Sequence, residues 1–137
     1  MSVVVPHRAI EAVSESKDPK KAIMDWIGDL SGVHMMADTV LIGTFIRPKK
    51  TAGGIIRPDV NVQEDVWQGK AGLVLKCGPD AFKDTPDYSF NGETVSVGEW
   101  VVYKVGDAWS LNIKGYPCRL IRDVSIKLKV DDPSIVF

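Results

Sequence analysis

The side chains that most often act as general bases, thiol nucleophiles or zinc ligands are few and scattered in this chain. They are two histidines, His7 and His34, and two cysteines, Cys77 and Cys118, in 137 residues. Their separations do not fit a zinc site, in which paired ligands are a few residues apart. Both cysteines lie within or at the end of apolar, strand-like runs, where a buried and unreactive thiol is usual. We therefore predict no enzyme activity, no metal and no cofactor.

Patterns for binding phosphates, nucleic acids or membranes are also missing. The stretches "AGG" and "GKAG" lack the spacing of a phosphate-binding loop. Trp67, Trp100 and Trp109 could stack on bases, but the net charge is −1, without the basic excess that nucleic-acid or anionic-membrane binding needs. We read neither a membrane-spanning run nor a secretion signal in the sequence. We expect no nucleic-acid partner, no membrane partner and reduced cysteines.

The clearest element is a predicted helix at about residues 18–31, "DPKKAIMDWIGDLS". Asp18 suits the N-cap, Pro19 the first helical position, and Gly32 is placed to end the helix. One apolar stripe runs along it, made of Ile23, Trp26, Ile27 and Leu30. A helix of about three turns is not stable alone, so we expect the stripe to dock on its own domain or on a neighbour.

From residue 36 onward, short β-type runs alternate with turn residues, and Asn91-Gly92 is a hairpin-type turn. This pattern predicts a mainly β fold, a small barrel or sandwich. We divide the chain into an N-terminal arm at residues 1–35, a β-barrel at 36–130 with a loop at 47–66, and a C-terminal tail at 131–137.

The loop contains "KKTAGGIIRP", residues 49–58, which places two aliphatic side chains beside a glycine pair. Gly53 and Gly54 give the backbone freedom that a helix or central strand does not tolerate well. Ile55 and Ile56 follow directly, and then Arg57. The arrangement is typical of a segment that presents a small apolar contact on a flexible hinge.

Four stretches together resemble the GroES-type co-chaperonins: "DTVLIGTFIRPKKTAGGII", "WQGKAGLVLKCGPDAF", "VSVGEWVVYK" and "CRLIRDVSIKLKV". The resemblance covers about residues 36–130, and "GPDAF" and "YPCRL" are most similar to divergent GroES-like proteins of tailed phages. It implies a GroES-like β-barrel whose loop docks in a groove on the apical domain of a chaperonin. Ile55 and Ile56 would be the anchors, Gly53 and Gly54 the hinge, and a ring of copies would multiply the weak contact.

Three features depart from that family. Arg57 stands where a third aliphatic residue is usual, and an arginine in an apolar groove is costly unless it is paired. The helical arm and the tail are additions to the short family plan. The tail ends in three apolar residues, Ile135, Val136 and Phe137.

These departures leave more than one interpretation of function. Our first is a non-enzymatic phage assembly protein, a homo-oligomer located in the virion that decorates or stabilises a capsid or other shell. The alternative is a co-chaperonin in the host cytoplasm, which caps a GroEL-type chaperonin and assists capsid-protein folding. A third is a small oligomeric β-domain with an undefined binding role.

Overall fold

A computed structural model of the chain describes residue 13, residues 16–47 and residues 70–136. One helix, α2, precedes six strands in the described chain. Their bounds are α2 (Pro19–Ile27), β1 (Thr39–Thr44), β2 (Ala71–Cys77), β3 (Trp100–Tyr103), β4 (Trp109–Ile113), β5 (Tyr116–Arg122) and β6 (Ile126–Val130). Three short 3-10 turns follow β3, β5 and β6: η1 (Val105–Asp107), η2 (Asp123–Ser125) and η3 (Pro133–Ile135).

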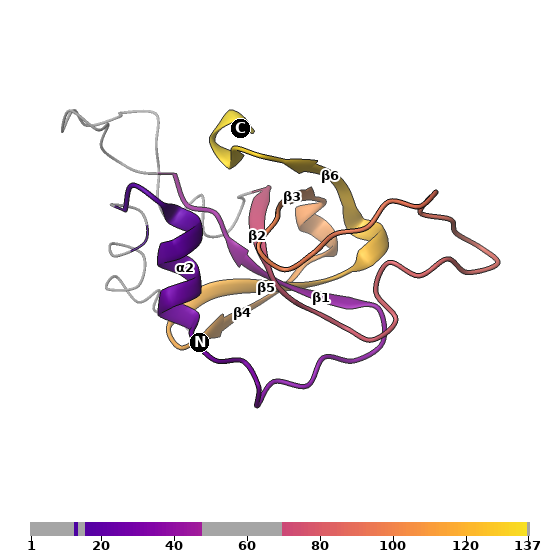
Figure 1. The fold of residues 1–137 in the computed structure, drawn as a ribbon, viewed down its shortest axis with the longest axis horizontal. Coiled ribbons are helices and arrows are strands. Elements are labelled where there is room, and N and C mark those ends of the chain that lie inside the picture. The colour runs from indigo at the N-terminus through magenta and orange to yellow at the C-terminus, as the bar shows by residue number, and fades with distance from the viewer. Residues whose placement is uncertain (1–12, 14–15, 48–69, 137) are drawn as a thin grey trace.

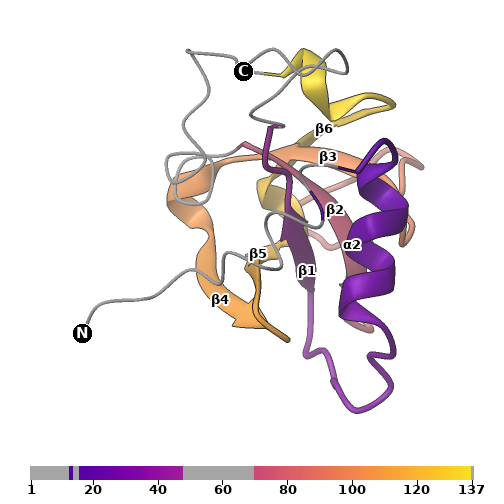
Figure 2. The ribbon, with the colours of Figure 1, turned by 90° about the vertical axis from the view of Figure 1, so that its left-hand side faces the viewer.

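The strands form one antiparallel sheet in the order β4-β5-β1-β2-β3-β6 (Figure 1). The hairpin between β4 and β5 turns through Lys114 and Gly115, which both have positive φ, as a tight two-residue hairpin turn requires. A register shift at Leu41/Ile42 interrupts the pairing of β1 with β2. In Figure 2, β1 runs upright while β3 passes across the top, so the sheet is strongly curled. The prediction of a mainly β fold with one N-terminal helix is confirmed.

Both faces of the central strands are buried, which explains their continuous apolar sequences. We call the cluster on the face that carries α2 the helix-side core. It consists of Val13, Ile23, Ile27, Leu41, Phe45, Ala71, Leu73, Leu75, Trp100, Tyr116 and Cys118. We call the cluster on the opposite face the far-side core, and it consists of Val40, Ile42, Val74, Val101, Tyr103 and Ile121.

The helix begins as predicted and ends earlier. The side chain of Asp18 accepts a hydrogen bond from the N–H of Lys21, and Pro19 occupies the first turn. The predicted end near residue 31, with Gly32 as the terminator, was wrong. Gly28 ends the helix, with φ of 66° and its N–H donated to Met24 O at 2.9 Å. Of the predicted stripe, Leu30 therefore lies beyond the helix.

Residues 78–99, between β2 and β3, form a long excursion held mostly by local bonds. Asn91 and Gly92 both have positive φ, at 55° and 79°, as the predicted turn requires. Asp84 accepts the N–H of Phe90 at 2.8 Å, and an isolated bridge joins Thr85 to Tyr88.

Candidate protein-interaction site

The sheet fixes both ends of the segment that carries the predicted contact residues. The five predicted loop residues all lie outside the described residues. They are Gly53, Gly54, Ile55, Ile56 and Arg57. The chain is described up to Arg47 and again from Lys70. The N–H of Phe45 donates to Ala71 O at 3.0 Å, and the N–H of Tyr103 donates to Lys70 O at 3.0 Å. We call residues 44–47 and 70–73 the stems, because main-chain bonds hold them beside each other.

Each stem is packed on its inner side. Phe45, Ile46 and Ala71 are all buried. The ring of Phe45 meets that of Trp100 edge-on, with centroids 5.5 Å apart and an interplanar angle of 77°. Aromatic pairs favour this geometry, so the contact fixes the stem in one position relative to β3.

Polar side chains are buried beneath the stems. The hydroxyl of Tyr116 donates to Thr44 O at 2.5 Å, and burial raises the pKa of that phenol. Arg119, which is 1% exposed, donates to Tyr103 Oη at 3.1 Å. Burial also raises the pKa of Tyr103, an effect that the nearby guanidinium opposes. Such hydrogen-bonded groups fix the ends of the segment more firmly than apolar contacts alone.

The helix docks on its own domain, and not all of the predicted stripe is buried. Ile23 and Ile27 are buried, but Trp26 is 36% exposed, so the expectation that Trp26 would be buried was wrong. Its ring lies at the margin of the contact, and Nε1 donates to Lys114 O at 2.8 Å. Leu30 is half-buried and packs against the helix-side core.

Two lysines that the sequence analysis did not single out hold the chain after the helix. Lys76 Nζ donates to Leu30 O at 2.8 Å and to Val33 O at 2.6 Å. Lys114 Nζ donates to Asp29 O at 3.3 Å. A lysine inside the apolar run "GLVLKC" was the available signal, because a charged residue there needs a partner.

The tail is only partly within the described chain. Ile135 is 72% exposed, Val136 is half-buried, and Phe137 lies outside the described residues. The described part of the tail is the turn η3, in which Asp132 accepts from the N–H of Ser134 at 2.9 Å.

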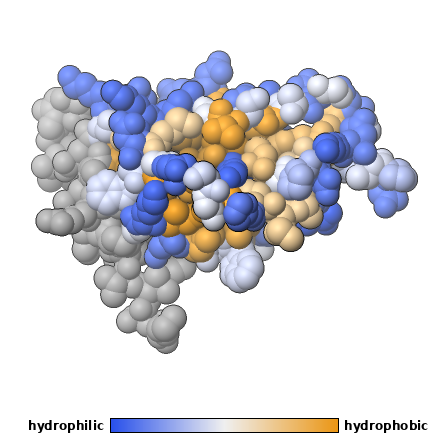
Figure 3. Space-filling view, turned by 60° about the horizontal axis from the view of Figure 1, so that its bottom comes forward, coloured by the Kyte–Doolittle hydropathy of each residue, from blue (hydrophilic) through white to orange (hydrophobic). Residues whose placement is uncertain are grey.

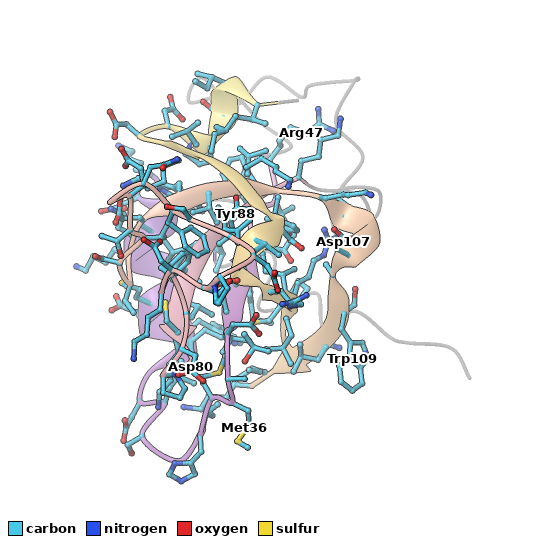
Figure 4. The ribbon with its side chains drawn as sticks, turned by 90° about the vertical axis from the view of Figure 1, so that its right-hand side faces the viewer. Met36, Arg47, Asp80, Tyr88, Asp107 and Trp109 are labelled. Carbon is cyan, nitrogen blue, oxygen red and sulfur yellow. The ribbon has the colours of Figure 1, made fainter. Side chains whose placement is uncertain are left out.

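Several large apolar side chains are exposed elsewhere. Trp109 of β4 is 74% exposed and projects away from the body, and Met36, 73% exposed, lies at the opposite end from Arg47 (Figure 4). Leu128 of the edge strand β6 is 48% exposed. Apolar patches separated by hydrophilic residues also appear on the face shown in Figure 3. The exposed edge of a sheet is a template for pairing with another chain, so β4 and β6 are candidate contact surfaces.

A shallow cavity of about 250 Å³ separates the 78–99 excursion from β6. Phe82, Tyr88 and Phe90 line one side, and Phe90 meets both other rings edge-on. Asp123 is buried there and accepts the N–H of Phe82 at 2.9 Å. Since this carboxylate is used to fix the excursion, the cavity has the features of a packing seam rather than of an active site.

The described residues offer no cluster of histidine, cysteine and carboxylate side chains that could hold a metal ion. Burial raises the pKa of the Cys118 thiol to about 12 and raises that of the half-buried Cys77. In the described part of the chain, no helix has the length and apolar character needed to cross a membrane.

A comparison with known protein families shows which family the chain belongs to. Residues 32–130 match the Chaperonin 10 Kd subunit (Cpn10) family. The chain belongs to the Cpn10 family. The match spans β1 to β6 and both stems, and it begins after α2. None of the curated proteins compared with the chain matches it.

The family relationship confirms the GroES-type resemblance and the prediction of a non-enzymatic protein, because Cpn10 proteins are non-enzymatic co-chaperonins. It also implies a heptameric oligomer and a chaperonin partner. It provides no support for a phage origin or for a capsid partner, so those two calls remain predictions.

Proposed function

We propose that this protein is a co-chaperonin: a ring of identical subunits that caps a GroEL-type chaperonin. The observation that carries the proposal is the Cpn10 match over the whole described sheet. Of the two interpretations drawn from the sequence, the match favours the alternative. Nothing in the structure or the comparisons favours the virion role.

In this function, Ile55 and Ile56 bind the chaperonin and Gly53 and Gly54 give them reach. Support comes from the stems, because buried aromatic and polar side chains anchor both ends of a 22-residue segment whose own sequence favours flexibility. Fixed ends limit the volume that the two isoleucines can explore, which raises their effective concentration at a groove.

The ring is proposed from the edges of the sheet. β4 and β6 have no partner beyond them within the described sheet, and each carries one exposed large apolar residue, Trp109 and Leu128. Met36 adds a third exposed apolar contact. Burial of such side chains between copies would stabilise a closed ring by the hydrophobic effect. In the co-chaperonin function we place the protein in the cytoplasm.

The test is a binding assay of the full chain against a GroEL-type chaperonin, with and without nucleotide. The wild type should bind in a nucleotide-dependent manner, and Ile55→Ser/Ile56→Ser should abolish binding while leaving the ring intact by sedimentation. Ile135→Ser, at the exposed tail, is the control and should bind like the wild type. Wild-type binding to empty capsid shells but not to the chaperonin would instead support the virion role.

A further inference from the structure

The helix α2 lies outside the family match, yet the matched sheet contains residues that fit it. Gly43 is the next-to-last residue of β1, and a glycine within a strand weakens it and often marks a close approach. A Cβ atom at Gly43 would stand 3.0 Å from Ile23 Cγ2 and 3.3 Å from Leu75 Cδ1. The missing side chain therefore makes the hollow in which Ile23 is buried.

The helix contacts widely separated parts of the sheet. Met24 packs against the helix-side core and approaches Gly98, just before β3. At its end, Trp26 is bonded to Lys114 in the β4–β5 turn. The helix also covers Gly43 of β1 and contacts β2 (Figure 2).

One packed core contains side chains of both α2 and the stems. Ile23, Trp100, Phe45 and Ala71 all belong to the helix-side core. The ring of Trp100 meets Phe45 of the first stem, and Phe45 N–H is bonded to Ala71 of the second.

We propose that α2 is a brace, which positions both stems through Ile23, Trp100 and Phe45 and so sets how well the intervening segment engages a chaperonin. The last part of this proposal rests on the proposed co-chaperonin function. The helix has only nine residues, too few to be stable without its docking surface. Loss of docking therefore unfolds the helix and loosens the stem packing in one step.

Two substitutions release the helix by different routes. Gly43→Val fills the hollow of Ile23, and Lys76→Met removes two hydrogen bonds to the chain after the helix while keeping the alkyl stem. Gly32→Val is the control for the first, because a Cβ atom at Gly32 meets nothing within 4 Å. Lys83→Met, on the exposed part of the 78–99 excursion, is the control for the second. Ile126→Ala removes packing against the far-side core and controls for a general loss of stability.

The measurements are amide hydrogen exchange of residues 19–27, 44–46 and 71–73 in the full chain, and affinity for a GroEL-type chaperonin with nucleotide. We expect Gly43→Val and Lys76→Met to accelerate exchange in all three segments and to weaken binding by about tenfold or more. The controls should leave the stems protected and the affinity unchanged.

Faster exchange that is confined to residues 19–27, with the stems still protected, would overturn the brace. So would full chaperonin affinity in a variant whose helix is released. If the wild type does not bind the chaperonin, the proposed function fails, and exchange at the stems still decides whether α2 is a brace.

Discussion

Trp26 and Lys114 are 88 residues apart in the sequence, and Trp26 Nε1 donates to the main-chain oxygen of Lys114 at 2.8 Å. Lys114 has φ of 49° and forms the β4–β5 turn together with Gly115. A tight turn leaves carbonyl groups without sheet partners, and the indole satisfies one of them. The contact therefore joins a helix outside the family match to a turn within it.

Trp26→Phe should lower the free energy of unfolding by about 1 kcal/mol, since it removes one hydrogen bond and keeps most of the ring contact. Trp26→Ala should cost less than the ~3–5 kcal/mol of a fully buried tryptophan, because the side chain is 36% exposed. Urea unfolding measures both. Trp109→Phe, at a residue 74% exposed, is the control and should change stability by no more than ~0.5 kcal/mol in the monomer. Equal effects at the two tryptophans would contradict the role of the Lys114 contact.

Gly78→Ala should destabilise the fold by about 2 kcal/mol or more, as overpacking against a rigid backbone does. A Cβ atom at Gly78 would lie 2.3 Å from Ala37 O and 2.9 Å from Met36 O, and main-chain atoms cannot rotate away. The N–H of Gly78 also donates to Thr39 O at 2.8 Å, which fixes this approach. Gly106→Ala is the matched control, because a Cβ atom there meets nothing within 4 Å. Thermal unfolding of the two variants side by side would show the difference, and similar melting temperatures would refute it.

The fold could be predicted because its signals are local. The strands were predicted from runs in which apolar residues alternate or occupy both faces. The start of the helix was predicted from Asp18 and Pro19. The helix end was missed because two glycines, Gly28 and Gly32, both fit a terminator, and only the bond from Gly28 N–H to Met24 O decides between them. Periodicity places Trp26 on the apolar stripe, yet how far a stripe is covered depends on the width of the surface it meets.

The candidate site was less predictable, for a physical reason. Its contact residues remain a prediction, made from isoleucines beside glycines and from the GroES-type resemblance. The residues that hold the site are distant in sequence: Gly43 opposite Ile23, and Lys76 opposite Leu30 and Val33. Nothing local indicates which glycine in a strand faces a helix, or which lysine bonds a carbonyl 46 residues away.

Stability should fall as the pH rises above 9, because Cys118 keeps its proton in the folded protein. Burial raises its pKa from 9.0 to about 12, whereas the unfolded thiol ionises near its ordinary value. The folded state is therefore fully stabilised below pH 9 and loses on the order of 1 kcal/mol per pH unit above it, toward pH 12. Cys77, whose pKa is also raised, adds to this loss of stability, and Tyr116 adds to it only from about pH 10 upward. The measurement is the free energy of unfolding in urea from pH 8 to pH 10. In Cys118→Ala the decline should be clearly shallower than in the wild type, and an unchanged slope would mean that this thiol ionises in the folded state.

Arg57→Leu should strengthen binding to a GroEL-type chaperonin. Arg57 follows the two isoleucines at the place where the family usually has a third aliphatic residue, so leucine would add apolar burial of about 1–2 kcal/mol per arm. In a ring that gain is multiplied across the arms that bind together, so the change in overall affinity should be large. Lys83→Leu makes the same kind of change on the exposed 78–99 excursion and should leave chaperonin affinity unaltered.

A second assay, against capsid shells that lack the protein, separates the two interpretations. In a shell contact the guanidinium would pair with a carboxylate or carbonyl oxygen, and its loss would leave that group unsatisfied and weaken attachment. If Arg57→Leu lowers the affinity for the chaperonin, the arginine is itself a contact residue. The proposal that this position faces an apolar groove would then be wrong.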